Sequence, residues 1–160
     1  MKRSSKFIAH SAIIAALYVV LTYFANALGL ANGAIQVRFS ESLTVLPVFT
    51  PAAIPGLFLG CLISNILSGC IFWDVVFGSL ATLLGAIFTR ILKNYKKIAC
   101  IPPILSNTII IPFVLKFAYG LPAGIGYFIL TVGIGEIISC GILGMILLFY
   151  LEKHKNAINW

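Results

Sequence analysis

Charge is scarce in this 160-residue chain: 9% of its residues are charged, and 4 of them are acidic. A soluble domain carries about 25% charged residues. Hydrophobic residues make up 61% of the chain, and its mean hydropathy is +1.08. A soluble fold of this size keeps too large a surface fraction to hide so much apolar area. The composition therefore excludes a soluble domain and predicts a membrane protein.

Metal-binding and disulfide patterns are also lacking. No two cysteines have CxxC spacing, and two histidines are the only imidazoles in the chain. Buried cysteine usually behaves as a small hydrophobic residue. We therefore expect no metal, no disulfide and no cofactor. The residues considered are Cys61, Cys70, Cys100, Cys140, His10 and His154.

Catalytic motifs are missing as well. The chain has no GxxxxGK[ST] phosphate loop, so we expect no ATPase site in it. Both histidines lie near helix ends that we assign to the cytoplasm, far along the chain from Glu41, Asp74 and Glu136. An intramembrane enzyme would need an acid pair or a base and nucleophile at fixed spacing. We therefore predict that the protein is not an enzyme.

What the chain does have is long, continuous apolar runs, which are typical of membrane helices and not of the alternating segments of a β-barrel. They predict an all-α, polytopic protein in one integral membrane domain, residues 1–160. A ten-residue α-helix spans only ~15 Å, so the second helix would either cross with help from irregular flanks or pack in the protein interior. Six transmembrane helices are expected, at about residues 7–28, 41–50, 53–68, 74–92, 102–119 and 127–151.

The basic residues predict the topology. Three clusters lie before the first helix, between the fourth and fifth, and after the sixth, and six spans place all three on one side. The positive-inside rule makes that side cytoplasmic, with both termini there. The net charge of +7 then indicates anionic lipid rather than nucleic acid. The clusters are Lys2, Arg3 and Lys6; Arg90, Lys93, Lys96 and Lys97; and Lys153 and Lys155.

Polar residues at or near membrane depth suggest a substrate pocket on the outer side. Glu136 lies inside a long apolar run. Placing a carboxylate there costs ~2–3 kcal/mol of insertion free energy, and ionisable residues at such depth usually have a function. The alternatives are a structural ion pair of Glu136 with Arg38 or Lys116, and an interfacial position for Trp73. The predicted pocket residues are Gln36, Arg38, Glu41, Asn65, Trp73, Asp74, Asn107 and Glu136.

Ala12 and Ala16 form a small-xxx-small pair in the first helix. Small residues four apart allow another helix to approach closely. The partner helix could belong to another protein or to this chain, and the pair alone does not distinguish the two.

Five motifs of the chain carry a resemblance to a known family. They are Gln36-Val-Arg-Phe-Ser-Glu41, Leu46-Pro-Val-Phe49, Pro51-Ala-Ala-Ile-Pro-Gly56, Asp74-Val-Val-Phe-Gly-Ser-Leu-Ala-Thr82 and Gly133-Ile-Gly-Glu136. With these motifs the chain resembles the QueT family, the substrate-binding (S) components of energy-coupling factor (ECF) transporters for queuosine precursors. The resemblance covers roughly residues 7–150.

The resemblance implies a six-helix protein of the bacterial plasma membrane that captures 7-aminomethyl-7-deazaguanine (preQ1) from outside. It implies docking through Ala12 and Ala16 onto a transmembrane coupling subunit, EcfT, which carries two ATPase subunits. The S component would then topple in the membrane and release its solute inward.

The expected chemistry of the pocket follows from that solute. Glu41 and Glu136 would serve as its two carboxylates, one for the N–H and amino edge of the base and one for the ammonium, in an order that the sequence leaves open. Arg38 would orient Glu41, and Trp73 or Phe39 would stack on the base. An S component for another cationic aromatic vitamin, such as thiamine, and a self-contained channel remain alternatives.

Overall fold

The computed structural model describes residues 2–30 and 35–154, with the side chains of residues 2–4 left aside. Over these residues the chain is helical and forms no strand, which confirms the all-α prediction. Lys155 and residues 31–33 of the expected first loop lie outside the described part. Its elements are α1 (Lys2–Ala27), η1 (Phe39–Val48), α2 (Ala53–Leu67), α3 (Phe72–Ile91), η2 (Lys96–Ile98), α4 (Ile101–Phe113), η3 (Val114–Ala118), α5 (Ile125–Glu136), η4 (Ile137–Gly144) and α6 (Met145–Lys153).

Four helical stretches are long and apolar enough to cross a membrane, and α2 is a shorter apolar helix. The last two long stretches are composite. In one, α4 continues into the π-helix η3; in the other, α5 and α6 are joined by the π-helix η4. The chain is thus a multi-pass membrane protein. The four stretches are Ser5–Ala27, Phe72–Ile91, Lys96–Ala118 and Ile125–Lys153.

The second predicted element is a 3₁₀-helix and not the α-helix that we expected at residues 41–50. Pro47 lies inside it and has no N–H to donate, and Ser42 and Thr44 donate side-chain hydrogen bonds to carbonyls three residues back. A 3₁₀-helix rises ~2.0 Å per residue, so ten residues reach ~20 Å rather than ~15 Å.

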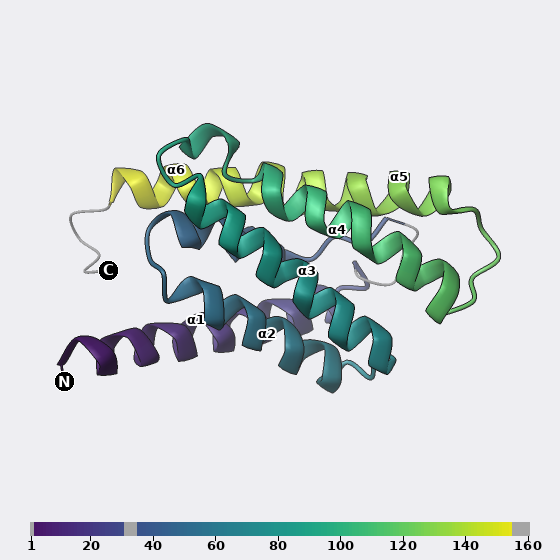
Figure 1. Cartoon of the computed structure of the whole chain (residues 1–160), viewed down its shortest axis with the longest axis horizontal. Helices are drawn as coiled ribbons and strands as arrows, with labels where there is room; N and C mark the ends of the chain where they lie inside the picture. Colours follow the sequence, from purple (N-terminus) through teal and green to yellow (C-terminus); the bar gives the residue numbers. More distant parts are fainter. Residues whose placement is uncertain (1, 31–34, 155–160) are drawn as a thin grey trace.

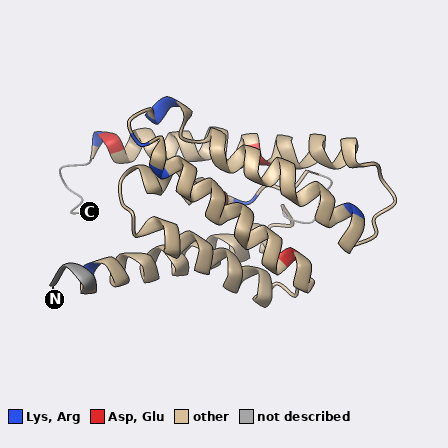
Figure 2. Ribbon diagram, viewed as in Figure 1, with Lys and Arg blue, Asp and Glu red and all other residues tan. Residues whose placement is uncertain are grey.

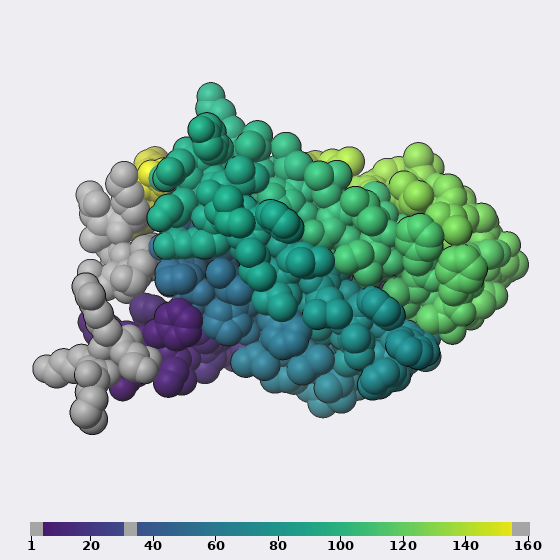
Figure 3. Space-filling model, viewed as in Figure 1, coloured from purple at the N-terminus to yellow at the C-terminus, as the bar shows by residue number. Residues whose placement is uncertain are grey.

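The helices enclose η1. In Figure 1, α1 and α2 run side by side along one edge, α3 and α4 cross the middle, and the α5–η4–α6 rod runs along the opposite edge. Contacts to η1 come from α1, α2, α3, α6 and η4, and eight of its ten residues are buried. Figure 3 shows α2, α3 and α4 as adjoining bands on one face of the molecule. The fold therefore places Glu41, in the first turn of η1, at the centre of the bundle.

Close approach of α1 and α2 depends on two glycines. A Cβ on Gly56 would lie 2.8 Å from the carbonyl oxygen of Ser11, and a Cβ on Gly60 would lie 2.6 Å from Cβ of Tyr18. Any larger residue would push α1 outward. These glycines thus bring Tyr18 over the interior of the bundle, where its side chain is 1% exposed.

Basic residues gather at one end of the molecule, where α1 begins, α6 ends and η2 lies (Figure 2). Lys96 of η2 forms an ion pair there with Glu152 of α6. The acidic residues Glu41 and Glu136 are instead buried in the interior. The arrangement agrees with the charge distribution from which we predicted the topology.

Arg90 fixes the far end of η1. Its Nη1 donates to the carbonyl oxygens of Pro47 and Val48, at 3.0 and 3.2 Å. We expect Arg90→Met to cost about 2 kcal/mol, since hydrogen bonds from a charged donor contribute ~1.5–3 kcal/mol. Thermal unfolding of the purified protein should show a melting temperature lowered by about 4–8 °C. Lys93→Met, at an exposed position in the same basic cluster, is the control and should shift it by less than about 1 °C. Equal shifts in both variants would contradict this role.

Candidate functional site

A cavity of about 130 Å³ lies between the segment 36–41 and helices α2 to α5; we call it the inner cavity. Its wall is polar on the side of Glu41 and apolar toward Ile111, Leu115 and Leu121. Five of the eight predicted pocket residues line the polar side: Gln36, Arg38, Glu41, Asn107 and Glu136. The polar lining residues are Gln36, Arg38, Glu41, Thr82, Asn107, Thr131 and Glu136.

Two buried carboxylates face each other at this cavity. Carboxylate oxygens of Glu41 and Glu136 lie within 4.8 Å of each other and of Sγ of Cys140, and the two acids are 1% and 8% exposed. Asn107 Nδ2 donates to Oε1 of Glu136 at 2.9 Å, and Cys140 Sγ donates to its Oε2 at 3.1 Å. The hydroxyl of Tyr18 donates to Oε1 of Glu41. The structure thus brings the two acids together, supported by donors from three helices.

Backbone geometry sets this arrangement. Glu136 is the last residue of α5, and the following turns widen into the π-helix η4, a form that is frequent at functional sites. Gly135 lies directly against the carbonyl oxygen of Gln36, where no Cβ fits. The backbone N–H of Arg38 donates to Oγ of Ser139 at 3.0 Å. Residues 36–38 are therefore laid against the α5–η4 rod next to Glu136.

Arg38 makes no ion pair with an acid in the described part of the chain. Its Nη2 donates to Oε1 of Gln36 at 3.3 Å, while Lys116 donates to the carbonyl of Leu121 at 3.3 Å. The alternative of a structural ion pair for Glu136 is thus not seen. Arg38 also does not contact Glu41 as an orienting residue would, although it lies close enough for electrostatic attraction.

A second, larger hollow of about 600 Å³ adjoins the inner cavity and shares Gln36 and Arg38 with it; we call it the outer hollow. Asp74 and Asn65 line the outer hollow and not the inner cavity. Asp74 is 6% exposed and accepts a hydrogen bond from the Tyr119 hydroxyl at 2.9 Å. Partial burial raises the pKa of Tyr119 above its usual value, and the negative charge of Asp74 raises it further. The hydroxyl of Tyr119 therefore stays protonated and remains a donor. The predicted residues therefore divide between two connected spaces.

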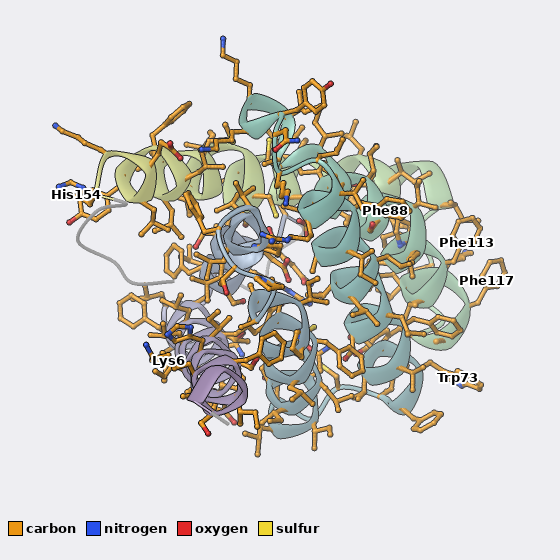
Figure 4. All side chains as sticks on the ribbon, turned by 60° about the vertical axis from the view of Figure 1, so that its left-hand side comes forward. Lys6, Trp73, Phe88, Phe113, Phe117 and His154 are labelled. Atoms are coloured by element: carbon orange, nitrogen blue, oxygen red, sulfur yellow. The ribbon has the colours of Figure 1, made fainter. Side chains whose placement is uncertain are left out.

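Trp73 lies in neither space. It is 54% exposed, stacks on Phe77 with ring centroids 5.9 Å apart, and points away from the bundle in Figure 4. Stacking of the Trp73 indole on a solute in either space does not fit this position, and an interfacial position for Trp73 stays a prediction. Phe39 packs on Phe24 and lines neither of the two spaces. The aromatic rings that line the inner cavity belong to Tyr127 and Phe128, which the sequence did not single out.

Tyr18 and Cys140 are further site residues that sequence reasoning missed. Cys140 follows Glu136 by four residues, so helical spacing could have indicated their contact. Tyr18 carries no local signal, because its partner Glu41 is 23 residues away on another element. Together with Glu41 and Glu136, Cys140 completes a described cluster close enough to hold a metal ion. The thiol, however, already serves as a hydrogen-bond donor to Glu136.

Ala12 and Ala16 lie on the outer face of α1, and both are exposed. The inner face uses other small residues: Ser11 and Ala15 contact Gly56 and Gly60 of α2. The small-xxx-small pair is therefore not used for packing within the described part of the chain.

The fold and the cavity define a class: a polytopic helical membrane protein with an acidic cavity inside an apolar bundle. Residues 8–153 match the sequence model of the QueT transporter family. The chain therefore belongs to the QueT transporter family, which confirms the resemblance found in its motifs.

A relative in that family supports the assignment. Over 102 residues the chain is 40% identical to the queuosine precursor transporter QueT of Lactococcus lactis subsp. cremoris (strain MG1363). The matched stretch covers 59% of this chain and 59% of the length of that relative. No solved structure matches the chain.

Proposed function

We propose that this chain is the S component of an ECF importer and captures the queuosine precursor preQ1 outside the cell. The relative's name supports a queuosine precursor as the solute. The observation that carries the proposal is the pair of buried carboxylates, Glu41 and Glu136, with Asn107 at the inner cavity. An isolated charge at such depth is costly unless a partner compensates it.

The chemistry of preQ1 fits these groups. The solute carries a flat base with N–H donors and a cationic aminomethyl arm. Carboxylates accept from N–H groups and from an ammonium, and an amide can donate to a carbonyl and accept from an N–H. The rings of Tyr127 and Phe128 supply apolar faces for the base.

The partners of the proposed function are a coupling subunit of the EcfT type and two ATPase subunits. The exposed pair Ala12 and Ala16 supports docking of α1 on that subunit. We further propose six membrane crossings, with η1 and α2 as the second and third, and both termini in the cytoplasm. The gathering of basic residues at one end supports this topology. The protein would topple on its partner to release solute inward.

Binding of preQ1 to the purified protein tests the proposal. Calorimetry should give a Kd of about 1 μM or tighter, which corresponds to about −8 kcal/mol. Thiamine should bind at least about 100-fold more weakly, because its pyrimidine and thiazolium rings present no fused guanine-like edge to two acids. Glu136→Gln should weaken preQ1 binding by at least about tenfold, since it removes a charge and one acceptor.

Glu152→Gln is the matched control. Glu152 pairs with Lys96 at the end of the molecule where the basic residues gather, so its replacement should leave the Kd of preQ1 unchanged. Tight thiamine binding without preQ1 binding would instead assign the protein to the alternative vitamin. Absence of preQ1 binding to the folded protein would overturn the proposed solute.

A further inference from the structure

The oxygens of the two facing carboxylates are not equally occupied. Both oxygens of Glu136 accept hydrogen bonds, from Asn107 and Cys140. On Glu41, Oε1 accepts from Tyr18, but Oε2 is buried and has no hydrogen-bond partner among the described residues. A buried carboxylate oxygen without a partner is costly, and such an atom requires an explanation. Because Glu41 lines the inner cavity, a bound solute can supply the missing donor.

A single free oxygen favours one kind of donor. The N–H and amino edge of a guanine-like base donates two parallel hydrogen bonds and pairs best with both oxygens of one carboxylate. Neither acid offers such an open pair, because Tyr18 occupies Oε1 of Glu41, while Asn107 and Cys140 occupy both oxygens of Glu136. A primary ammonium is a compact charge whose three donors rotate freely, and one oxygen is enough for it.

The charge of the inner cavity agrees with a cationic donor. Its charged lining residues are Arg38, Glu41 and Glu136. The lining holds two acids against one base, and buried carboxylates within 4.8 Å of each other are stabilised by a bound cation. The guanidinium of Arg38 is already directed to Gln36 and does not lie in contact with either acid.

Tyr18 is held in a fixed position beside the carboxylate of Glu41. Its side chain is 1% exposed, and Gly60 of α2 lies against its Cβ. One turn further along α1, Thr22 donates to Oγ of Ser40, the residue before Glu41. Two contacts from α1 thus fix the start of η1, and the one from Tyr18 fixes the carboxylate itself.

From this geometry we infer that Oε2 of Glu41 receives the primary ammonium of the solute, with Tyr18 as the positioning residue that leaves only this oxygen free. The inference rests on the proposed function and assigns the roles within it. Glu41 discriminates solutes by their ammonium, whereas Glu136 and the amide of Asn107, which can both donate and accept, meet the base through single hydrogen bonds.

The test compares two solutes that share the base and differ in the arm. PreQ1 carries the aminomethyl ammonium, whereas preQ0 carries an uncharged nitrile. Glu41→Gln should raise the Kd of preQ1 by about 100-fold and that of preQ0 by less than about threefold, measured by calorimetry. Glu136→Gln should weaken both solutes by similar factors.

Tyr18→Phe provides the second variant. It retains the charge of Glu41 but releases its Oε1, so we expect the preference for preQ1 over preQ0 to fall by about fivefold or more. A merely structural role for Tyr18 would weaken both solutes equally and leave this ratio unchanged. The control is Tyr95→Phe, at a residue that is 67% exposed and lines neither space, and it should leave both Kd values unchanged.

The outcomes separate this inference from the proposed function. If the unmodified protein binds neither base, the proposed function fails. If it binds both and Glu41→Gln weakens them equally, the proposed function holds and the ammonium assignment is wrong. If Glu41→Gln does not fold, the ratio measured for Tyr18→Phe decides the role of Glu41, and an unchanged ratio overturns it.

Discussion

Replacing Gly135 with valine is expected to weaken preQ1 binding by about 100-fold. No Cβ fits at this position, because the carbonyl oxygen of Gln36 lies directly against the glycine. Overpacking costs ~1–3 kcal/mol, and a rigid backbone neighbour places this case at the upper end, which corresponds to about 100-fold in a Kd. The strain is relieved when residues 36–38 move away from α5, and that movement opens the polar wall of the inner cavity.

Gly133→Ala is the matched control, two residues earlier on the same helix. A Cβ there would meet Thr108 at 3.5 Å, an ordinary van der Waals contact. We expect its Kd for preQ1 to stay within about threefold of the original, because that contact needs no backbone shift. Calorimetry on both purified variants makes the comparison, with thermal unfolding to confirm that each is folded. Unchanged binding in Gly135→Val would show that the segment of Gln36 does not form part of the site.

Replacing Ala16 with tryptophan is expected to reduce cellular uptake of preQ1 to background, at least about 20-fold below the original, while binding to the purified protein stays within about twofold. Ala16 is exposed on the outer face of α1, turned away from the cavity. A bulky side chain would prevent the close helix approach that small residues allow. Uptake of labelled preQ1 by cells that carry the whole transporter measures the first quantity, and calorimetry measures the second. Ala12→Trp should behave in the same way.

Ile146→Trp serves as the control for this experiment. Ile146 is 62% exposed on α6, so the new ring faces outward on a different helix. Its uptake should stay within about twofold of the original, because exposed substitutions rarely disturb the fold. If Ala16→Trp transports as well as this control, docking through the alanine pair is wrong and the self-contained channel becomes the better account.

The sequence by itself determined the class of protein and the position of most helices. Continuous apolar runs with charged ends leave few options for a chain in lipid, since every backbone polar group must bond within a helix or a barrel. For that reason the predicted bounds of the first, third and fourth helices lie within a few residues of α1, α2 and α3, except at the start of α1. Because the chain has only four acidic residues, Glu41 and Glu136 could be selected as candidate site residues from the sequence, and each is the last residue of a family motif.

Only the tertiary structure decided which of these residues meet. Trp73 and Asp74 are neighbours in the chain, yet one faces outward and the other lines the outer hollow, because adjacent helical residues point about 100° apart. Tyr18 reaches Glu41 because Gly60 allows α1 to approach α2, a contact between positions far apart in sequence. Local patterns report which residues are costly to bury, whereas their partners depend on how helices cross. The roles that we propose for Glu41 and Glu136 therefore rest on the hydrogen-bond donors from α1, α4 and η4, which no local pattern predicted.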